Sequence, residues 1–224
     1  MTFYERLVQE TQEEKKGLYS APIIQRALKG EISKDEYILF LNQAYHHVKH
    51  TVPLLMACGS RLNDRYEWIK KALTHYIEEE YGHEKWILND INNAGGDSEK
   101  TQKSKADITT EAMVAFAYHQ IDRKNPLGFF GMVYVLEGTS TELATTAATK
   151  IAESLKLSNK AFSYLLSHGS LDLEHVDFFT ELINQVSSEE DQKAIIDSAK
   201  SIYKLYGDIF RAIPQMNKLG IKNE

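Results

Sequence analysis

The sequence predicts an all-α protein built as one bundle of helices. Apolar residues recur at spacings of three and four along most of the chain, as at Tyr37, Phe40, Leu41 and Ala44, and this period is typical of helices packed on a core. We find no sustained alternation of apolar and polar residues of the kind that a strand needs. We therefore expect a single domain, residues 1–224, of seven to eight helices.

Helix ends are indicated by capping residues and by the four prolines and 12 glycines. Ser33 and Glu36 form a capping box that opens one helix, and Pro126 is suited to the first turn of another. The stretch 96–106 is the one clearly loop-like segment. The expected helices lie near residues 2–17, 20–29, 33–63, 66–94, 107–123, 126–155, 158–185 with a break near Gly169, and 188–212.

Composition excludes several classes of protein. The chain has 26 Lys and Arg against 32 Asp and Glu, a net charge of −6, and no basic block, which argues against nucleic acid as a partner. The longest apolar runs are too short to span a membrane, and the first residues lack a signal-peptide layout. One cysteine, Cys58, excludes an internal disulfide. We expect a cytoplasmic protein.

The first candidate site is the segment HYIEEEYGHEKW, residues 75–86. Glu80 precedes His83 by three residues and Glu79 precedes it by four, so either acid can share a helical face with the histidine. Carboxylate and imidazole pairs of this kind bind iron, manganese or zinc. A run of glutamates on the surface remains the alternative for this segment.

The second candidate is Glu137, a lone acid in the most apolar helix expected in the chain. A buried carboxylate is costly unless a cation compensates its charge or its pKa rises. Pairing with a nearby lysine or arginine remains an alternative. The small residues that follow, Gly138, Thr139 and Ser140, leave room for a ligand or a close helix.

The third candidate is the segment SHGSLDLEHVDFF, residues 167–179. At the helical rotation per residue, Asp172 lies about 40° and His175 about 20° from His168 around the helix. The three side chains form one narrow stripe, which resembles half of a dinuclear metal site. Surface polar residues are the alternative.

Together these segments supply three carboxylates and three imidazoles from three separate long helices. Such hard to borderline donors suit two iron or manganese ions bridged by carboxylate. A structural zinc site is disfavoured because thiolate ligands are absent. The six candidate ligands are Glu80, His83, Glu137, His168, Asp172 and His175, with Glu79 as the substitute for Glu80.

At these motifs the sequence resembles the haem-oxygenase-like diiron oxidases, the iron-containing redox enzymes of the thiaminase-II and PQQ-synthesis-like superfamily. The resemblance rests on EEYGH at 79–83, LEG around Glu137 and HxxxDxxH at 168–175, in that order. GEISKDEY and AYHHVKHTVPLL also look like the early helices of the superfamily. One departure concerns the carboxylate that some relatives place two turns before the histidine, because Tyr76 stands there in this chain.

The resemblance implies a haem-oxygenase-like bundle, two iron(II) ions per chain held by the six ligands, and dioxygen as co-substrate. It implies a non-haem diiron oxidase or oxygenase that acts through a peroxo-diiron intermediate on a small amino-acid-like or carboxylate substrate. Desaturation, carbon–carbon cleavage and N-oxygenation are the implied reactions. A homodimer is also implied, and an external electron donor is left open as a partner.

Other members of the superfamily fit less well. Haem oxygenase needs a histidine in its first helix, and none precedes His46. Thiaminase-II enzymes carry a catalytic cysteine on the helix that here carries Glu137, whereas Cys58 lies on another helix. A cofactorless oxidase or a thiaminase-II-like enzyme of the same fold, or a non-catalytic ligand-binding helical protein, remain alternatives.

The substrate pocket is harder to assign from the sequence. His46 and His50 are four residues apart and share a helical face, but histidines on a long helix are often surface residues. No pattern singles out Lys49 or Arg61 as the partner of a substrate carboxylate. The expected pocket residues are His46, His47, His50, Tyr76 and Tyr134.

Overall fold

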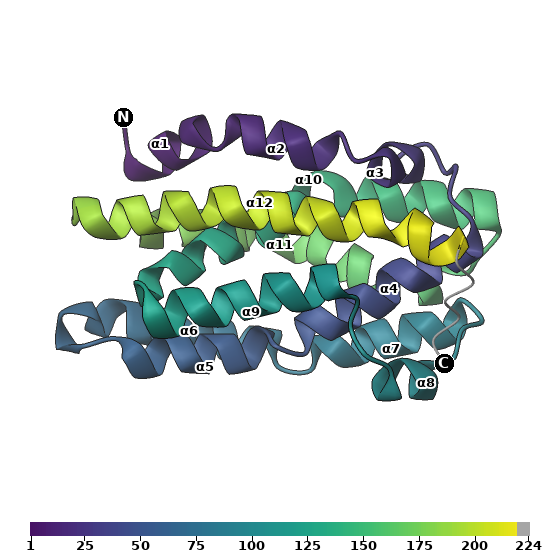
Figure 1. Cartoon of the computed structure of the whole chain (residues 1–224), viewed down its shortest axis with the longest axis horizontal. Coiled ribbons are helices and arrows are strands. Elements are labelled where there is room, and N and C mark those ends of the chain that lie inside the picture. The colour runs from purple at the N-terminus through teal and green to yellow at the C-terminus, as the bar shows by residue number, and fades with distance from the viewer. Residues whose placement is uncertain (219–224) are drawn as a thin grey trace.

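The computed structural model describes residues 1–218, and for residues 168–175 it describes the backbone alone. The chain forms an elongated helical bundle in which α12 runs the length of the molecule (Figure 1). Three short turns, η1 (Asp64–Tyr66), η2 (Pro126–Gly128) and η3 (Asn159–Ala161), join some of the helices. The helices are α1 (Phe3–Glu10), α2 (Gln12–Tyr19), α3 (Pro22–Ala27), α4 (Lys34–Val48), α5 (Thr51–Arg61), α6 (Glu67–Glu80), α7 (His83–Asn93), α8 (Ser98–Lys103), α9 (Ile108–Arg123), α10 (Phe129–Leu155), α11 (Ser163–Ile183) and α12 (Glu189–Lys218).

The predicted all-α bundle is confirmed, and the described residues contain no strand. The predicted boundaries were wrong in several places. Three of the long helices are split, near Thr11, at Lys49 and His50, and at Gly82. The expected loop at 96–106 contains the short helix α8, while α11 runs without the expected break at Gly169.

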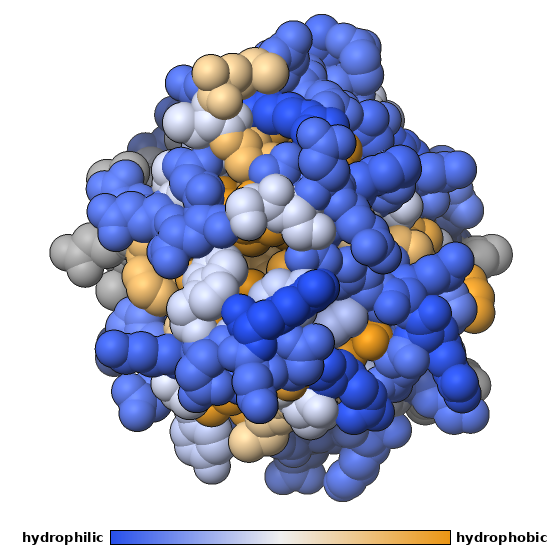
Figure 2. Space-filling view, turned by 90° about the vertical axis from the view of Figure 1, so that its left-hand side faces the viewer, coloured by the Kyte–Doolittle hydropathy of each residue, from blue (hydrophilic) through white to orange (hydrophobic). Residues whose placement is uncertain are grey.

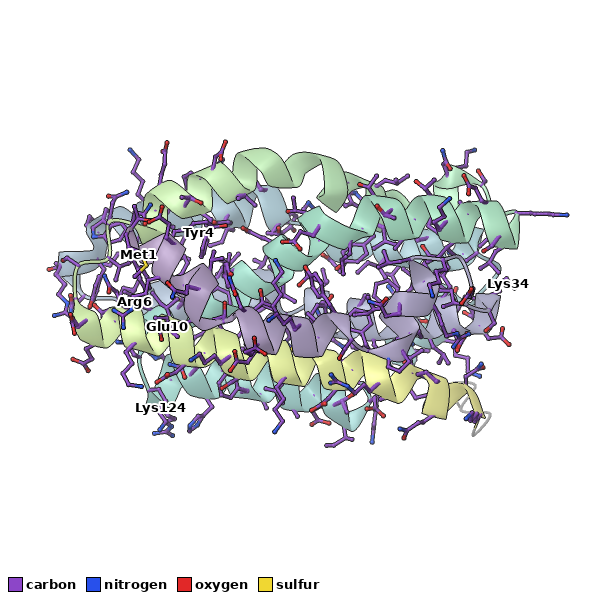
Figure 3. The ribbon with its side chains drawn as sticks, turned by 90° about the horizontal axis from the view of Figure 1, so that it is seen from above. Met1, Tyr4, Arg6, Glu10, Lys34 and Lys124 are labelled. Carbon is purple, nitrogen blue, oxygen red and sulfur yellow. The ribbon has the colours of Figure 1, made fainter. Side chains whose placement is uncertain are left out.

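The end of the molecule seen in Figure 2 is largely hydrophilic, with hydrophobic residues showing in places between the hydrophilic ones. Seen from above, Lys34 and Lys124 lie at opposite ends of the bundle, while Arg6 and Glu10 of α1, which form an ion pair of 2.7 Å, lie beside each other (Figure 3). Among the described residues, no helix is both long and apolar enough to cross a membrane.

Helix α10 lies at the centre of the packing. Its start is mostly buried: six of the seven residues from Phe129 to Val135 are buried, and Phe129, Phe130 and Val135 are each 3% exposed or less. It packs most extensively against α11 and α12. Burial of each large apolar side chain contributes about 1.5–3 kcal/mol, so this part of α10 is the main apolar anchor of the bundle.

Gly131 brings the backbones of α10 and α12 into direct contact. A Cβ atom at this position would lie 2.5 Å from the carbonyl oxygen of Ile195 and 2.6 Å from the amide nitrogen of Ala199. Neither backbone atom can move aside as a flexible side chain could. The close approach therefore requires glycine and sets the separation of the two helices.

Asp90 of α7 holds the first turn of α11. Its carboxylate accepts hydrogen bonds from the backbone nitrogens of Ser163, at 2.9 Å, and Tyr164, at 2.8 Å, and from the Ser163 hydroxyl. The residue at the N-cap of α11, Phe162, makes no side-chain capping bond. Burial raises the pKa of Asp90, while these donors act in the opposite direction. Asp90, which is fully buried, thus replaces a local cap and fixes α11 against α7.

We expect Gly131→Ala to lower the free energy of unfolding by about 2 kcal/mol or more, because the added methyl group overlaps the backbone of α12. Gly138→Ala on the same helix is the matched control, since no atom lies within 4 Å of its Cβ position, and we expect it to be neutral or to stabilise by up to about 1 kcal/mol. Urea denaturation measures both. Equal effects of the two substitutions would contradict the close approach.

Candidate metal and substrate site

The break between α6 and α7 brings Glu80 and His83 together. Glu80 ends α6, Gly82 adopts a positive φ of 95°, and His83 begins α7. The Nδ1 atom of His83 lies 3.1 Å from a carboxylate oxygen of Glu80, and its ring stacks on Trp86 at 4.0 Å. The predicted pairing is therefore present, but a tight turn at a glycine makes it rather than one continuous helix.

This contact with Glu80 bears on the tautomer of His83. When Nδ1–H donates to the Glu80 carboxylate, Nε2 is the ring nitrogen that can bind a metal ion. The ring is 5% exposed and is held between a carboxylate and an indole. Such support is typical of a metal-binding histidine, whose orientation is fixed by its second nitrogen.

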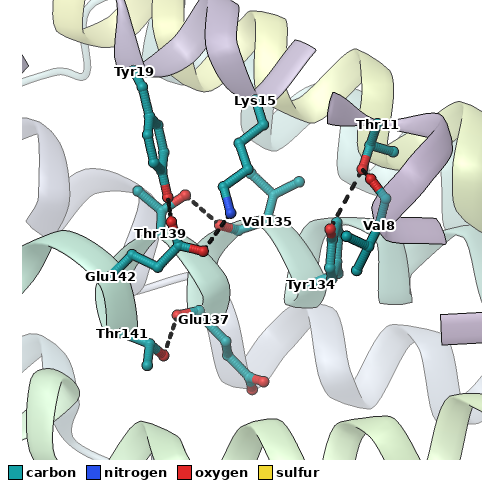
Figure 4. A network of polar contacts seen from close by, with 10 residues as sticks. All are labelled: Val8, Thr11, Lys15, Tyr19, Tyr134, Val135, Glu137, Thr139, Thr141 and Glu142. Atoms are coloured by element: carbon teal, nitrogen blue, oxygen red, sulfur yellow. Dashed lines mark hydrogen bonds and ion pairs between the residues drawn. The ribbon is translucent and has the colours of Figure 1, made fainter. Parts of the chain in front are cut away.

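Glu137 lies in the middle of α10, and one of its carboxylate oxygens is fully buried. On the other side of α10, Glu142 pairs with Lys15 and accepts a hydrogen bond of 2.8 Å from the Tyr19 hydroxyl. The Glu137 carboxylate points away from this network (Figure 4). The helix therefore presents Glu142 to this network and Glu137 to a different side.

Glu80 and Glu137 line one pocket of about 70 Å³ between α4, α5, α6, α10, α11 and α12. We call it the polar pocket. Apolar side chains of α5 and α10, among them Leu54 and Met132, form the rest of its wall. Its polar lining residues are His47, Thr51, Tyr76, Glu80, Glu137, Ser140, Tyr164 and Tyr206.

Tyr76 places a buried hydroxyl group in this pocket. The side chain is 2% exposed, and among the described residues its hydroxyl has no hydrogen-bond partner. Burial, followed by the negative charges of Glu137, Glu79 and Glu80, raises the pKa of Tyr76 far above its ordinary value. A neutral phenol therefore faces the two carboxylates that line the pocket.

Glu79 points elsewhere. One of its carboxylate oxygens lies 3.3 Å from Nε2 of His75, whose side chain is 49% exposed. Glu79 does not line the polar pocket, whereas Glu80 does. Of the two acids considered from the sequence, the geometry favours Glu80.

The side chains of His168, Asp172 and His175 lie outside the described residues. The backbone of α11, which carries them, packs along α10 and α7, the helices of Glu137 and His83. Among the described residues, no group of three or more histidine, cysteine or acidic side chains is arranged to hold a metal ion. These three ligands therefore stay predictions.

Only two of the five expected pocket residues, His47 and Tyr76, line the polar pocket. His46 instead faces α8, where Nε2 lies 2.9 Å from the Ser104 hydroxyl and Nδ1 lies 3.1 Å from the Lys49 ammonium. His50 contacts the hydroxyl of Tyr118 at 3.3 Å. Adjacent residues of a helix point in different directions, which is why His46 and His47 separate.

Tyr134 also lies away from the polar pocket. Its ring packs edge-on against Tyr4 and Tyr203, and its hydroxyl lies 3.4 Å from that of Thr11. The candidate cations are also elsewhere, since Lys49 contacts His46 and Arg61 pairs with Asp122 at 2.8 Å.

Two tyrosines of the pocket were missed from the sequence. Tyr164 and Tyr206 come from α11 and α12, and the ring of Tyr206 meets His47 edge-on at 5.8 Å. Both sit at ordinary core spacing for a helix, so no local signal separates them from other buried aromatic residues.

Cys58 has no part in this site. The thiol is fully buried in α5 and donates to the carbonyl oxygen of Pro126 at 3.3 Å. Burial raises the pKa of Cys58 to about 12, and a reactive cysteine needs the opposite shift. Nucleophilic chemistry of the thiaminase type has no cysteine to use among the residues that line the polar pocket.

The model of the iron-containing redox enzyme family matches residues 38–207 of the sequence. This chain belongs to that family. The matched region begins in α4 and ends in α12, so it includes every segment proposed to carry a ligand. No curated protein matches the sequence.

Solved structures show the same fold. A domain of unknown function with a haem-oxygenase-like fold from Shewanella denitrificans is 22% identical, with a TM-score of 0.89 over 100% of this chain and 97% of that one. A TenA homologue from Pseudomonas syringae is 14% identical, with a TM-score of 0.81 over 95% and 93%. Haem oxygenase-1 from the cyanobacterium Synechocystis, in complex with haem, is 12% identical, with a TM-score of 0.76 over 99% and 97%. The predicted haem-oxygenase-like fold is confirmed.

We expect Tyr76→Phe to leave the free energy of unfolding unchanged or to raise it by up to about 1 kcal/mol, because the variant removes a buried hydroxyl without a described partner. Tyr66→Phe is the matched control, since its hydroxyl donates to Asp191 at 2.6 Å; we expect a loss of about 1–2 kcal/mol. Thermal and urea denaturation measure both. Strong destabilisation by Tyr76→Phe would show that the hydroxyl has a structural partner.

Burial, Lys49 and His50 together lower the pKa of His46 from its ordinary 6.5 to about 4. Between these values the unfolded chain binds the proton and the folded protein does not, so His46 destabilises the fold as the pH drops from 6.5 to 4. We expect this to account for roughly 3 kcal/mol between pH 7 and pH 4. The measurement is the pH dependence of unfolding in the wild type minus that in His46→Gln, with NMR titration of the ring. An imidazole that titrates near pH 6.5 would contradict the assignment.

Proposed function

We propose that this protein is a non-haem diiron enzyme that uses dioxygen to oxidise a small organic substrate bound in the polar pocket. The observation that carries the proposal is that two carboxylates from different helices, Glu80 and Glu137, line one pocket. The ring of His83 is in hydrogen-bond contact with the Glu80 carboxylate. This donor set suits iron or manganese.

Three of the six proposed ligands, Glu80, His83 and Glu137, have described side chains, and their chemistry is that of iron ligands. Glu80, His83 and Glu137 would hold the metal on the side of α6, α7 and α10. His168, Asp172 and His175 of α11 would hold it from the opposite side, since the α11 backbone packs along α10 and α7. Bound iron(II) would supply the activation of dioxygen.

Contacts within the protein fix the orientation of the proposed metal ligands, and apolar residues line the pocket beside them. The Glu80 contact and the Trp86 stack hold His83 in one orientation, and Asp90 fixes the first turn of α11. Apolar side chains form much of the wall of the polar pocket, and surroundings of low polarity strengthen electrostatic interactions. The hydroxyl of Tyr76 is available to donate a hydrogen bond to a bound substrate.

The test of the proposal is metal content. The metal-free protein, loaded anaerobically with iron(II) and desalted, should retain two irons per chain. Glu137→Gln, His83→Ala and His168→Ala should each reduce the retained iron by half or more, because each removes a ligand. Iron is counted by a colorimetric chelator assay, and oxygen uptake by the loaded protein is followed with an electrode.

Two control variants make the same types of substitution at positions outside the pocket. Glu142→Gln lies on the same helix as Glu137 but alters the pair with Lys15, and His75→Ala removes an exposed imidazole that pairs with Glu79. Both should retain two irons. Trace iron in the wild type, or equal iron in Glu137→Gln and Glu142→Gln, would refute the diiron proposal.

A further inference from the structure

A second cavity, of about 80 Å³, lies beside the polar pocket. We call it the apolar chamber. It is enclosed by side chains of α3, α4, α10, α11 and α12, most of them aliphatic or aromatic. Representative lining residues are Ile24, Phe40, Leu143, Ala147, Phe210 and Ile213. Nothing in the chemistry proposed above uses this space.

The two cavities share part of their walls. Ser140, Tyr164 and Tyr206 line both the polar pocket and the apolar chamber. These three residues therefore form a common wall between the pocket that Glu137 lines and the chamber, which reaches Ile151. Along α10 the distance from Ser140 to Ile151 is roughly 16 Å at the rise of a helix.

Small side chains of α10 leave this space open. Ser140, Ala144 and Ala147 face the chamber at spacings of four and three. Protein interiors are usually packed without such voids, and an apolar cavity of this size is suited to an apolar ligand rather than to ordered water.

The charges of the lining point to the same kind of ligand. Among the described residues that line either cavity there is no lysine or arginine. The described lining of the chamber therefore offers mostly apolar contacts and no cationic side chain that could bind a second, anionic group of the ligand. A small amino acid would leave this apolar space unfilled.

We infer that the substrate carries an aliphatic chain, which occupies the apolar chamber while the polar, reacting end lies in the polar pocket. That this molecule is a substrate rests on the proposed function. Binding of its aliphatic chain in the chamber does not depend on that function. The inference narrows the substrate class to molecules with one polar head and one extended apolar tail.

The test is calorimetric titration of the full-length protein with straight-chain carboxylates from butanoate to tetradecanoate. Alkylamines of the same lengths form a second arm that identifies the preferred head group. Each added methylene should lower Kd roughly three- to fourfold until the chamber is full, after which Kd should level off. The titrations are done with metal-free protein and with protein loaded anaerobically with iron(II).

Substitutions in α10 test whether the aliphatic chain of the ligand binds in the apolar chamber. Ala144→Phe fills the chamber and should weaken binding of the longest chains tenfold or more, while butanoate binding stays unchanged. Ala147→Leu is a milder filling variant, used if the first fails to fold, and should end the gain in affinity at a shorter chain. Thr145→Phe, on the exposed side of the same helix, is the matched control and should behave as the wild type does.

The outcomes separate the two proposals. Affinity independent of chain length, or a dependence that Ala144→Phe and Ala147→Leu leave unchanged, overturns the inference even if the protein binds two irons. A chain-length dependence that the filling variants abolish supports it. If that dependence occurs in a protein that binds no iron, the chamber binds the chain but the diiron function is refuted.

Discussion

The close approach of α10 to α12 at Gly131 is the constraint on which the rest of the structure depends. The backbone contacts at Ile195 and Ala199 set how deeply α10 lies in the bundle. That depth brings Glu137, less than two turns later, to the polar pocket, and the same helix pair places Tyr206 between the two cavities. The absence of a side chain at Gly131 thus helps to position Glu137, the polar pocket and the apolar chamber.

Two further local features position the proposed ligands. The left-handed turn at Gly82 allows α6 to end on Glu80 and α7 to begin on His83, so that the two side chains meet. On the other side, buried Asp90 binds the first backbone nitrogens of α11. A backbone turn in the first case and a buried carboxylate in the second determine where a helix begins, and therefore where the functional residues it carries lie.

Much of the fold and part of the site could be predicted from the sequence. The helical period is a local signal that led to a correct expectation about the bundle, while the acid in an apolar helix drew attention to Glu137, which the structure places in the lining of the polar pocket. The break at Gly82 was missed because the segment around it keeps a helical pattern on both sides. Tyr206 was missed because a residue that joins a pocket from a distant helix has the same spacing as any core aromatic residue. His46 was assigned to the pocket because a cluster of histidines does not reveal which of them faces inward.

The most direct measurement is the anomalous diffraction of crystals loaded anaerobically with iron(II), recorded at the iron absorption edge. We expect two peaks in the polar pocket, one close to His83 and both within ligand distance of a carboxylate of Glu80 or Glu137, facing α11. No peak in the pocket, or iron bound only at exposed histidines such as His75, would contradict the proposed diiron centre.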